Sequence, residues 1–429
     1  MPQTMTSRKR KVDSLTPVSS SRPEWAPSRD VFPWSSSAAV YGRCPNVSSR
    51  YEKIGRIGEG TYGVVYQAKD KQTGEIVALK RCLPHHEASD GFPMTTLREV
   101  TILRELHALG GSRHGIIDLR EVTVSSSRSG VFLVFEYCEH DLASLIDHYY
   151  TQHKSSPFKE SEVKRLMIQL LDAIKFLHSK YILHRDLKLS NLLYNAKGEI
   201  KVADFGLARR VGGEYVGEKP SAGKAKDDVE LTPKVVSLWY RPPELLLGGE
   251  TCDFAIDNWG VGCIMAELLR GKPLADGKSE LDQVQKLFDL LGAPDVDSWP
   301  ELKIMPALRS IQLPQRRHTT NGKHILDIFQ NWRNPAGMKL LMGLLTYNPN
   351  RRLTADDALK SSYFSSMVCS TTLSRSRYNS QSVTLTAYFF QPHPCPLTLM
   401  PRIPTRHGHE KEHSNERATG VGSKTVIEP

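Results

Sequence analysis

The chain has 429 residues, 39% hydrophobic and 24% charged, which is ordinary for a globular protein and long enough for two packed lobes with tails. It contains no run of about 18 apolar residues and no N-terminal apolar segment, so neither a membrane-spanning helix nor a secretory signal is expected. The formal net charge of +10 belongs mainly to the ends, because residues 1–50 hold eight Lys and Arg against three Asp and Glu, and residues 366–429 hold seven against four. The body between them carries little net charge, and no direct contact with nucleic acid is expected.

Both ends of the chain have the composition of disordered tails. Residues 1–50 are rich in Ser, Pro and Arg without periodicity, and residues 365–429 are rich in Ser, Thr, Pro and His. Within the first tail, Arg8-Lys9-Arg10-Lys11 is either a nuclear-import signal or a solvated charge run, so a location in the nucleus, the cytoplasm or both is expected. The seven cysteines form no Cys-x-x-Cys pair, which favours a reducing compartment over a zinc site or a disulfide framework.

Between the tails the pattern changes from strands to helices. Apolar and polar residues alternate over residues 51–79 around glycines and a turn at 71–74, which predicts three strands. A helix is expected over residues 95–109 and a buried strand over 130–137. Further helices are predicted over residues 161–178 (with Ser161 as N-cap), 261–269, 281–291 and 336–345. The pattern favours an α+β fold with a β-rich first lobe, which has one key helix, and a mainly helical second lobe.

The first chemical motif is glycine-rich. The segment Gly58-Glu59-Gly60-Thr61-Tyr62-Gly63-Val64-Val65 has the pattern G-x-G-x-x-G-x-V. Glycines permit a tight turn whose backbone N–H groups come close to phosphate oxygens. A dinucleotide-binding loop shares part of this pattern, but such a loop opens a helix. Because a strand-like segment follows here, the motif favours a hairpin over the phosphates of ATP.

Lys80 ends the apolar segment Val77-Ala78-Leu79-Lys80. Burying an ammonium group is costly unless it is paired, and Glu99 on the following predicted helix is the expected partner. In that pairing Lys80 would be oriented toward the α- and β-phosphates. Taken alone, each of the two residues is better explained as a surface charge.

The decisive motif is His184-Arg185-Asp186-Leu187-Lys188-Leu189-Ser190-Asn191, which matches H-R-D-L-x-x-x-N at every fixed position. In phosphoryl transfer, Asp186 would accept or orient the proton of the substrate hydroxyl. Lys188 would stabilise charge on the transferring group, and Asn191 would hold a metal ion.

Two further motifs follow in the required order. Thirteen residues after Asn191 comes Asp204-Phe205-Gly206, whose carboxylate would bridge Mg²⁺ to the phosphates. Pro242-Pro243-Glu244 stands where A-P-E belongs. The ordered set predicts a protein kinase that uses ATP and Mg²⁺.

From about Tyr51 to Phe364 the chain resembles the cyclin-dependent kinase family, which implies a bilobal protein kinase fold with an N-lobe over about 51–137 and a C-lobe over about 138–364. The glycine-rich segment is similar to the GEGTYG loop of that family. The segment from Pro93 to Glu99 (PMTTLRE) is similar to its cyclin-docking helix, above all to the PISSLRE and PITSLRE types of kinases 10 and 11. Residues 237–241 and 257–263 are similar to its TLWYR and DMWxxGC segments.

The resemblance implies a serine/threonine kinase that phosphorylates Ser/Thr-Pro sites in cell-cycle or transcription regulation. Residues 235–237 are similar to the loop that prefers proline after the acceptor. Backbone groups of residues 136–138 would contact adenine, with Phe135 as gatekeeper. The implied ATP-binding residues are Ile57, Gly58, Glu59, Gly60, Thr61, Tyr62, Gly63, Val65, Ala78, Lys80, Glu99, Phe135, Glu136 and Cys138.

The resemblance also implies regulation from outside. A cyclin would dock on the helix that begins near Pro93, and an activating kinase would phosphorylate Thr232. Thr61 and Tyr62 match inhibitory phosphorylation sites, although both residues are equally well explained by the shape of their loop. The activating phosphate would be received by Arg98, Arg185 and Arg209 through charge-assisted hydrogen bonds.

The chain departs from the family pattern in three places. Pro242 replaces the alanine of A-P-E, Ser237 replaces a threonine, and residues 212–230 read as an insertion that is expected to be mobile. An inactive kinase fold acting as a cyclin-binding scaffold is the alternative of a different class, and the presence of Lys80, Asp186 and Asp204 argues against it. A relative of the MAP kinases would need T-x-Y, which Thr232-Pro233-Lys234 lacks.

Overall fold

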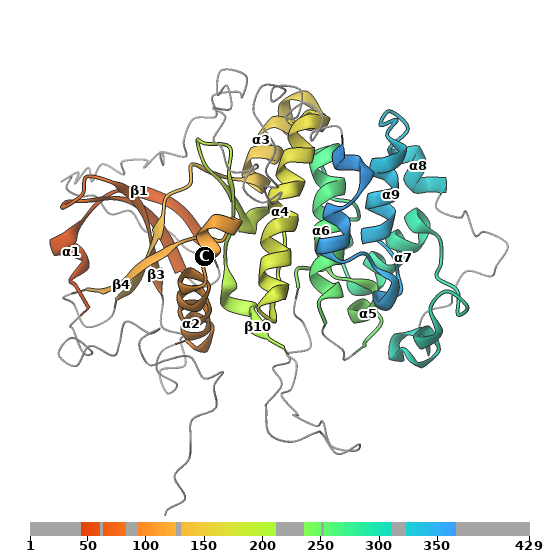
Figure 1. Cartoon of the computed structure of the whole chain (residues 1–429), viewed down its shortest axis with the longest axis horizontal. Helices are drawn as coiled ribbons and strands as arrows, with labels where there is room; N and C mark the ends of the chain where they lie inside the picture. Colours follow the sequence, from red (N-terminus) through yellow and green to blue (C-terminus); the bar gives the residue numbers. More distant parts are fainter. Residues whose placement is uncertain are drawn as a thin grey trace, which may run out of the picture. The chain divides into compact units, whose positions relative to one another are not determined.

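The computed structural model describes residues 44–60, 63–82, 93–125, 130–211, 236–249, 253–309 and 323–365. A strand-rich part comes first and a helix-rich part follows, as the sequence predicts (Figure 1). None of the helices within these residues combines the length and the apolar character that crossing a membrane requires.

The strand-rich part is built on a five-stranded antiparallel sheet in the order β1-β2-β3-β5-β4. The three strands predicted first are present, and so is the later apolar strand. Period-2 alternation in β3 puts Val77 and Leu79 into the core, so Ala78 and Lys80 face the opposite side. The strands are β1 (Tyr51–Gly60), β2 (Gly63–Asp70), β3 (Ile76–Cys82), β4 (Leu119–Val124) and β5 (Val131–Glu136).

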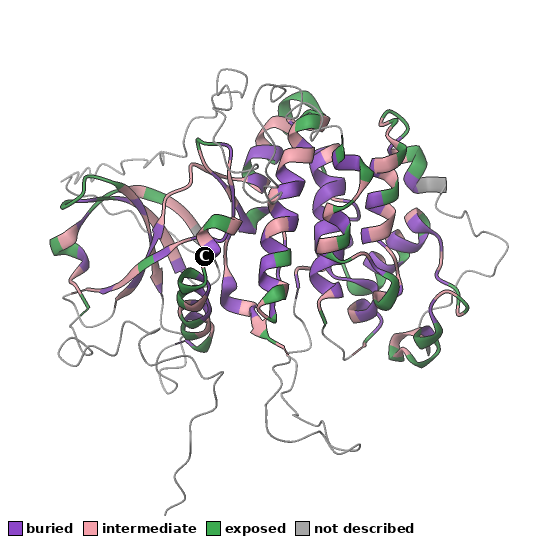
Figure 2. Ribbon diagram, viewed as in Figure 1, coloured by how far each residue is buried: buried purple, intermediate pink, exposed green. Residues whose placement is uncertain are grey.

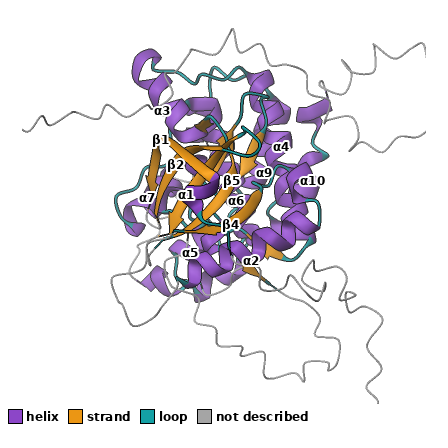
Figure 3. Ribbon diagram, turned by 90° about the vertical axis from the view of Figure 1, so that its left-hand side faces the viewer, coloured by secondary structure: helices purple, strands orange, loops and turns teal. Residues whose placement is uncertain are grey.

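Helix α2 (Met94–Ala108) packs beside this sheet, close to β4 (Figure 3). Its buried side carries Ile102, Leu103 and Leu106, and Glu99 is buried with them. Met94 and Leu97 stay exposed. The helix therefore presents one acidic group to the sheet and an apolar pair to solvent at its first turns.

The start of the described chain differs from the prediction of a disordered tail through residue 50. The short helix α1 (Val47–Arg50) buries Val47, and Asn46 forms a parallel β-bridge with Val124 of β4. Arg50 pairs with Asp70 at 3.3 Å and with Glu121 at 3.0 Å. One buried valine and two ion pairs thus attach this segment to the sheet, a signal too short to recognise in a Ser-rich sequence.

The helix-rich part is organised around α4 and α6, which lie side by side (Figure 1). Helix α6 is buried on almost every side, as expected for a core helix (Figure 2). The predicted helices are all present, but Ser161 is not the N-cap: α4 begins at Glu160, and the Glu162 carboxylate accepts the backbone N–H of Lys159 at 2.8 Å. The helices of this part are α3 (Leu142–His153), α4 (Glu160–Ser179), α5 (Pro243–Leu246), α6 (Ala255–Arg270), α7 (Glu280–Leu291), α8 (Lys323–Ile328), α9 (Pro335–Leu344) and α10 (Ala355–Leu359).

Short strands hold the segment that carries the chemical motifs. Strand β7 (Ile182–Leu183) directly precedes His184 and pairs with β10 (Arg209–Arg210). Strands β6 (His140–Asp141), β8 (Leu192–Tyr194) and β9 (Ile200–Val202) form a second small sheet. Because β8 begins just after Asn191 and β9 ends just before Asp204, the two predicted metal ligands stand at the ends of paired strands.

Candidate active site

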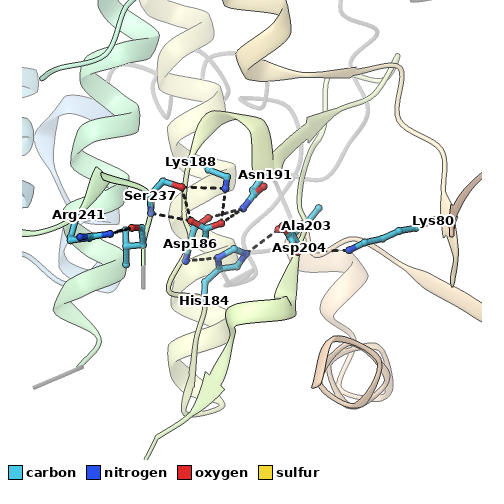
Figure 4. Close-up of polar contacts among 10 residues, drawn as sticks. Lys80, His184, Asp186, Lys188, Asn191, Ala203, Asp204, Ser237 and Arg241 are labelled. Atoms are coloured by element: carbon cyan, nitrogen blue, oxygen red, sulfur yellow. Dashed lines mark hydrogen bonds and ion pairs between the residues drawn. The ribbon is translucent and has the colours of Figure 1, made fainter. Parts of the chain in front are cut away.

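Asp186 is the centre of a hydrogen-bond network (Figure 4). Its Oδ2 accepts from Lys188 Nζ at 2.7 Å and from Asn191 Nδ2 at 3.2 Å. Its Oδ1 accepts from the Ser237 hydroxyl at 2.9 Å and from the Ser237 backbone N–H at 3.2 Å. The structure thus brings together the three residues that the H-R-D motif predicts and adds Ser237.

The charge of Asp186 is maintained against its burial. Burial raises the pKa of the carboxyl group, but the hydrogen bond and charge of Lys188, together with the charge of His184 and the hydrogen bond from Ser237, outweigh that effect, so the pKa lies below its ordinary value. Asp186 is therefore an ionised, oriented acceptor. Lys188 also donates to the Ser237 hydroxyl at 3.2 Å, which connects the lysine to the described segment that begins at Val236.

A second aspartate, Asp257, holds the backbone of the two residues that precede Asp186. Its two oxygens accept the backbone N–H groups of His184 and Arg185, each at 2.9 Å, and His178 Nε2 lies 3.0 Å from Oδ2. Arg185 has a φ of 64°, a left-handed conformation that needs such support. Asp257 belongs to a segment with a family resemblance, but this supporting role could not be predicted, because nothing in the spacing along the chain relates residue 257 to residue 184.

Lys80 and Glu99 form the predicted pair. Lys80 Nζ donates to both carboxylate oxygens of Glu99 at 2.8 Å and lies 3.7 Å from Asp204 Oδ1. Burial lowers the pKa of Lys80, but the carboxylates of Glu99 and Asp204 outweigh it and raise the pKa, so the ammonium group stays charged. Strand β3, helix α2 and the segment after β9 therefore meet at one cation.

The predicted ATP-binding residues lie on the same strands. Gly58 stands opposite Val65, Val65 opposite Lys80, and Ala78 opposite Phe135. Ile57 precedes Gly58 on β1, the backbone of Glu59 and Gly60 pairs with the start of β2 at Gly63, and Glu136 and Cys138 follow Phe135 at the end of β5. Thr61 and Tyr62 lie outside the described residues.

The donor set suits ATP and Mg²⁺. Asn191 donates its amide nitrogen to the Asp186 carbonyl oxygen at 2.8 Å, which leaves its oxygen as the end for a cation. Asp204 has a φ of 66° and keeps its carboxylate 31% exposed beside Lys80. Mg²⁺ prefers oxygen ligands and is commonly bound by one or two protein groups plus substrate phosphates. The described residues contain no group of three or more His, Cys, Asp or Glu side chains suited to a metal ion.

Two of the three predicted phosphate-receiving arginines bind the segment that leads to the third. Arg98 of α2 donates to the Gly206 carbonyl oxygen and Arg185 Nε to the Leu207 carbonyl oxygen, both at 2.8 Å. Arg209 follows two residues later in β10. Thr232 and residues 212–230 lie outside the described residues.

Val236 has an unusual backbone beside Asp186. Its φ is 71°, a conformation that β-branched residues rarely adopt. Its carbonyl oxygen accepts from Arg241 Nη2 at 2.8 Å and from Nε at 3.2 Å (Figure 4). Arg241 in turn pairs with Glu280 at 2.5 Å. The positive φ therefore turns this carbonyl toward Arg241.

Pro242, which replaces the alanine of A-P-E, is compatible with burial and pairing of Glu244 two residues later. Pro242 is the N-cap of helix α5, Pro243 is its first residue, where proline is favourable, and Glu244 is buried. The Glu244 carboxylate accepts two hydrogen bonds from Arg352, both at 2.8 Å.

Comparison with known proteins agrees with this site. Residues 51–364 match the family described as protein kinase domain. The chain is 43% identical over 384 residues to cyclin-dependent kinase 10 of Rattus norvegicus, covering 89% of this chain and 90% of that protein. It is 38% identical over 370 residues to a probable cyclin-dependent kinase 10 of Dictyostelium discoideum (85% and 87% covered) and 45% identical over 316 residues to cyclin-dependent kinase G-2 of Oryza sativa subsp. indica (73% and 41% covered). The chain belongs to the protein kinases and, within them, to the cyclin-dependent kinases, which phosphorylate serine or threonine.

Proposed function

We propose that the chain transfers the γ-phosphoryl group of ATP, with Mg²⁺, to serine or threonine residues that precede proline, and that it is activated by a cyclin and by phosphorylation of Thr232. The network around Asp186 is the observation that carries the catalytic part. It joins an ionised carboxylate, Lys188 and Asn191 through bonds of 2.7–3.2 Å. A scaffold without activity would not require that geometry.

Each residue has one task in this proposal. Asp186 orients the acceptor hydroxyl and takes its proton, and Lys188, 2.7 Å away, stabilises negative charge as the phosphoryl group moves. Lys80 holds the α- and β-phosphates. Asn191 and Asp204 would hold Mg²⁺, which neutralises charge on the phosphates when it is bound.

The backbone at Val236 supports the preference for proline. Its carbonyl oxygen is already bonded to Arg241, so it does not offer an acceptor to the backbone N–H of the residue after the target serine. An ordinary residue at that substrate position would leave its N–H unsatisfied on desolvation, which costs about 1–3 kcal/mol. Proline has no N–H and avoids this cost.

The exposed start of α2 supports docking of a cyclin. Met94 and Leu97 are 69% and 46% exposed on the segment that resembles the cyclin-docking helix. The same helix carries Glu99, the partner of Lys80. A protein that binds this face would therefore act directly on the position of the ion pair, and the names of the relatives point to a cyclin.

The proposal is tested by phosphoryl transfer from radiolabelled ATP to a Ser-Pro peptide and to a matched Ser-Ala peptide, with and without a panel of cyclins. We expect transfer to the Ser-Pro peptide, at least about tenfold less to the Ser-Ala peptide, and stimulation by one cyclin or more. ATP binding without transfer under any cyclin would instead support the scaffold.

Asp186→Asn should abolish transfer while leaving ATP affinity nearly unchanged, because Asp186 contacts the acceptor side of the reaction rather than the phosphates. The matched control is Asp147→Asn, which changes an exposed aspartate of α3 in the same way. Full activity in the Asp186 variant would remove this residue from the mechanism.

A further inference from the structure

Helix α2 is attached to the segment after Asp204 at two places. In its first half, Arg98 donates to the Gly206 carbonyl oxygen at 2.8 Å. Near its end, the Glu105 carboxylate accepts a hydrogen bond from Arg210 Nη2 and forms an ion pair with it. Glu99 lies between these two attachments on the helix. The second contact belongs to none of the motifs from which the catalytic site was predicted.

Arg210 is connected through its backbone to the catalytic loop, which we define as residues 184–191. It lies in β10, opposite Ile182 of β7, and β7 runs directly into His184. Helix α2 and strand β10 are neighbours in Figure 1, in agreement with the ion pair. The contact of Glu105 with Arg210 therefore joins the helix that carries Glu99 to the strand pair that carries the catalytic aspartate.

The contact is separate from the predicted phosphate cluster. Arg209 and Arg210 are consecutive residues of a strand, and consecutive side chains of a strand point to opposite faces. Arg209 can thus serve the activating phosphate while Arg210 serves α2. Two adjacent arginines would then have different tasks, one dependent on phosphorylation and one present without it.

We propose that Glu105 and Arg210 are positioning residues, which hold the C-terminal half of α2 against β10 and so keep Glu99 in reach of Lys80 before a cyclin binds. Glu99 and Glu105 are six residues apart, about 9 Å along the helix axis, so a tilt of α2 that separates Glu105 from Arg210 also moves Glu99. The consequence for activity rests on the proposed function, whereas the contact itself does not.

The size of the effect follows from the exposure of the pair. The side chains of Arg210 and Glu105 are 52% and 35% exposed, so solvent weakens their attraction. Exposed ion pairs change an equilibrium by about two- to fivefold at room temperature. We therefore expect changes of this size in how often α2 leaves its position, and smaller ones at high salt.

The test measures hydrogen exchange of the α2 backbone amides and the rate of phosphoryl transfer in the full chain. The variants are Arg210→Gln, Glu105→Gln and the exchanged pair Glu105→Arg with Arg210→Glu. The matched control is Arg120→Gln, which breaks the ion pair of Arg120 with Glu75 at 2.5 Å, another exposed contact of the strand-rich part that does not involve α2.

Each single variant should speed exchange in α2 and slow transfer without cyclin by about two- to fivefold, and the activating cyclin should remove most of the difference in transfer. The exchanged pair should restore both values toward those of the parent chain, and the control should change neither. Exchange rates equal to those of the control, or no restoration in the exchanged pair, would overturn the proposal. A parent chain without transfer under any cyclin would contradict the proposed function, and hydrogen exchange would still decide whether the contact holds α2.

Discussion

Glu267 is a titratable residue that the fold buries beside Tyr240. Its side chain lies on α6, and its Oε2 accepts a hydrogen bond from the Tyr240 hydroxyl at 2.6 Å. Burial raises the pKa of Glu267 from 4.5 to about 7, and the bond from Tyr240 and the charge of Arg270 offset only part of that rise. Near neutral pH the folded protein therefore holds this carboxyl group partly protonated.

The raised pKa of Glu267 predicts a loss of stability as pH rises from about 4.5 to above 7. A group whose folded pKa exceeds its unfolded pKa stabilises the fold fully below the unfolded value, here 4.5, and that contribution is lost as pH rises through about 7. Glu267→Gln keeps an acceptor for Tyr240 and removes the titration. The free energy of unfolding of the variant, relative to that of the parent chain, should increase by about 2 kcal/mol from pH 5.5 to pH 8. Denaturant unfolding of both proteins at the two pH values measures this difference.

Glu301→Gln is the control for this measurement, because Glu301 is an exposed glutamate of the same helical part. A difference between the Glu267 variant and the parent chain that stays constant with pH would show that Glu267 keeps its ordinary pKa. Equal pH dependence of the two Gln variants would lead to the same conclusion.

At the scale of residues, the sequence predicts the residues proposed for catalysis better than the contacts that hold those residues in place. The pairing of Lys80 with Glu99 could be predicted because a buried ammonium group needs a partner and the next helix offers one. The positive φ of Val236 could not, since local preference disfavours it and the bonds from Arg241 impose it. The support of His184 and Arg185 by Asp257 also depends on a contact between distant segments.

At the scale of elements, the segment before β1, residues 45–50, binds to strands β2 and β4 of the sheet. Pro45 accepts the backbone N–H of Val124 at 3.1 Å, and Arg50 reaches acidic residues of β2 and β4. The Tyr51 hydroxyl donates to the Glu121 carboxylate. Strands β2 and β4 are thus connected by Arg50, which composition alone assigns to the tail.

This segment, residues 45–50, should contribute measurably to the stability of the fold. Val47 is 4% exposed, so Val47→Ala removes two buried methyl groups and should lower the free energy of unfolding by about 1–2 kcal/mol. Ser48→Ala, at the neighbouring exposed position of α1, should change it by less than about 0.5 kcal/mol. Thermal unfolding of both variants decides the point, and equal melting temperatures would mean that α1 adds nothing to the fold.

The predicted elements succeed where one period dominates. The long helices α4, α6 and α7 follow from their apolar spacing, with ends shifted by a few residues at most in α4 and α7 and by more at the start of α6. Strand β4 (LREVTV) was not predicted, because charged residues interrupt its short apolar pattern and pairing with β5 stabilises it. The α1 segment fails for a similar reason, since a single buried valine gives no period.

At the scale of the whole molecule, the predicted phosphate site joins elements from both parts of the chain. Arg98 comes from α2, Arg185 from the catalytic loop and Arg209 from β10, and the first two already donate to neighbouring carbonyl oxygens of residues 206 and 207. A phosphate bound among them would connect helix α2 with the loop that carries Asp186. Such a bond would act on catalysis at a distance, because Glu99 on α2 and Asp186 on that loop both belong to the proposed catalytic site.

With cyclin bound, Thr232→Ala should therefore transfer phosphoryl groups at least about tenfold more slowly than the parent chain phosphorylated at Thr232. One charge-assisted hydrogen bond, which the variant lacks, contributes about 1.5–3 kcal/mol. Thr151→Ala, at an exposed site on α3, should leave the rate unchanged. If the phosphate acts through the arginines, Arg209→Gln should slow the parent chain but add little in the Thr232→Ala background, because both changes remove the same interaction. Independent, multiplying effects of the two substitutions would place the phosphate elsewhere, and an unchanged rate in Thr232→Ala would exclude control at this residue.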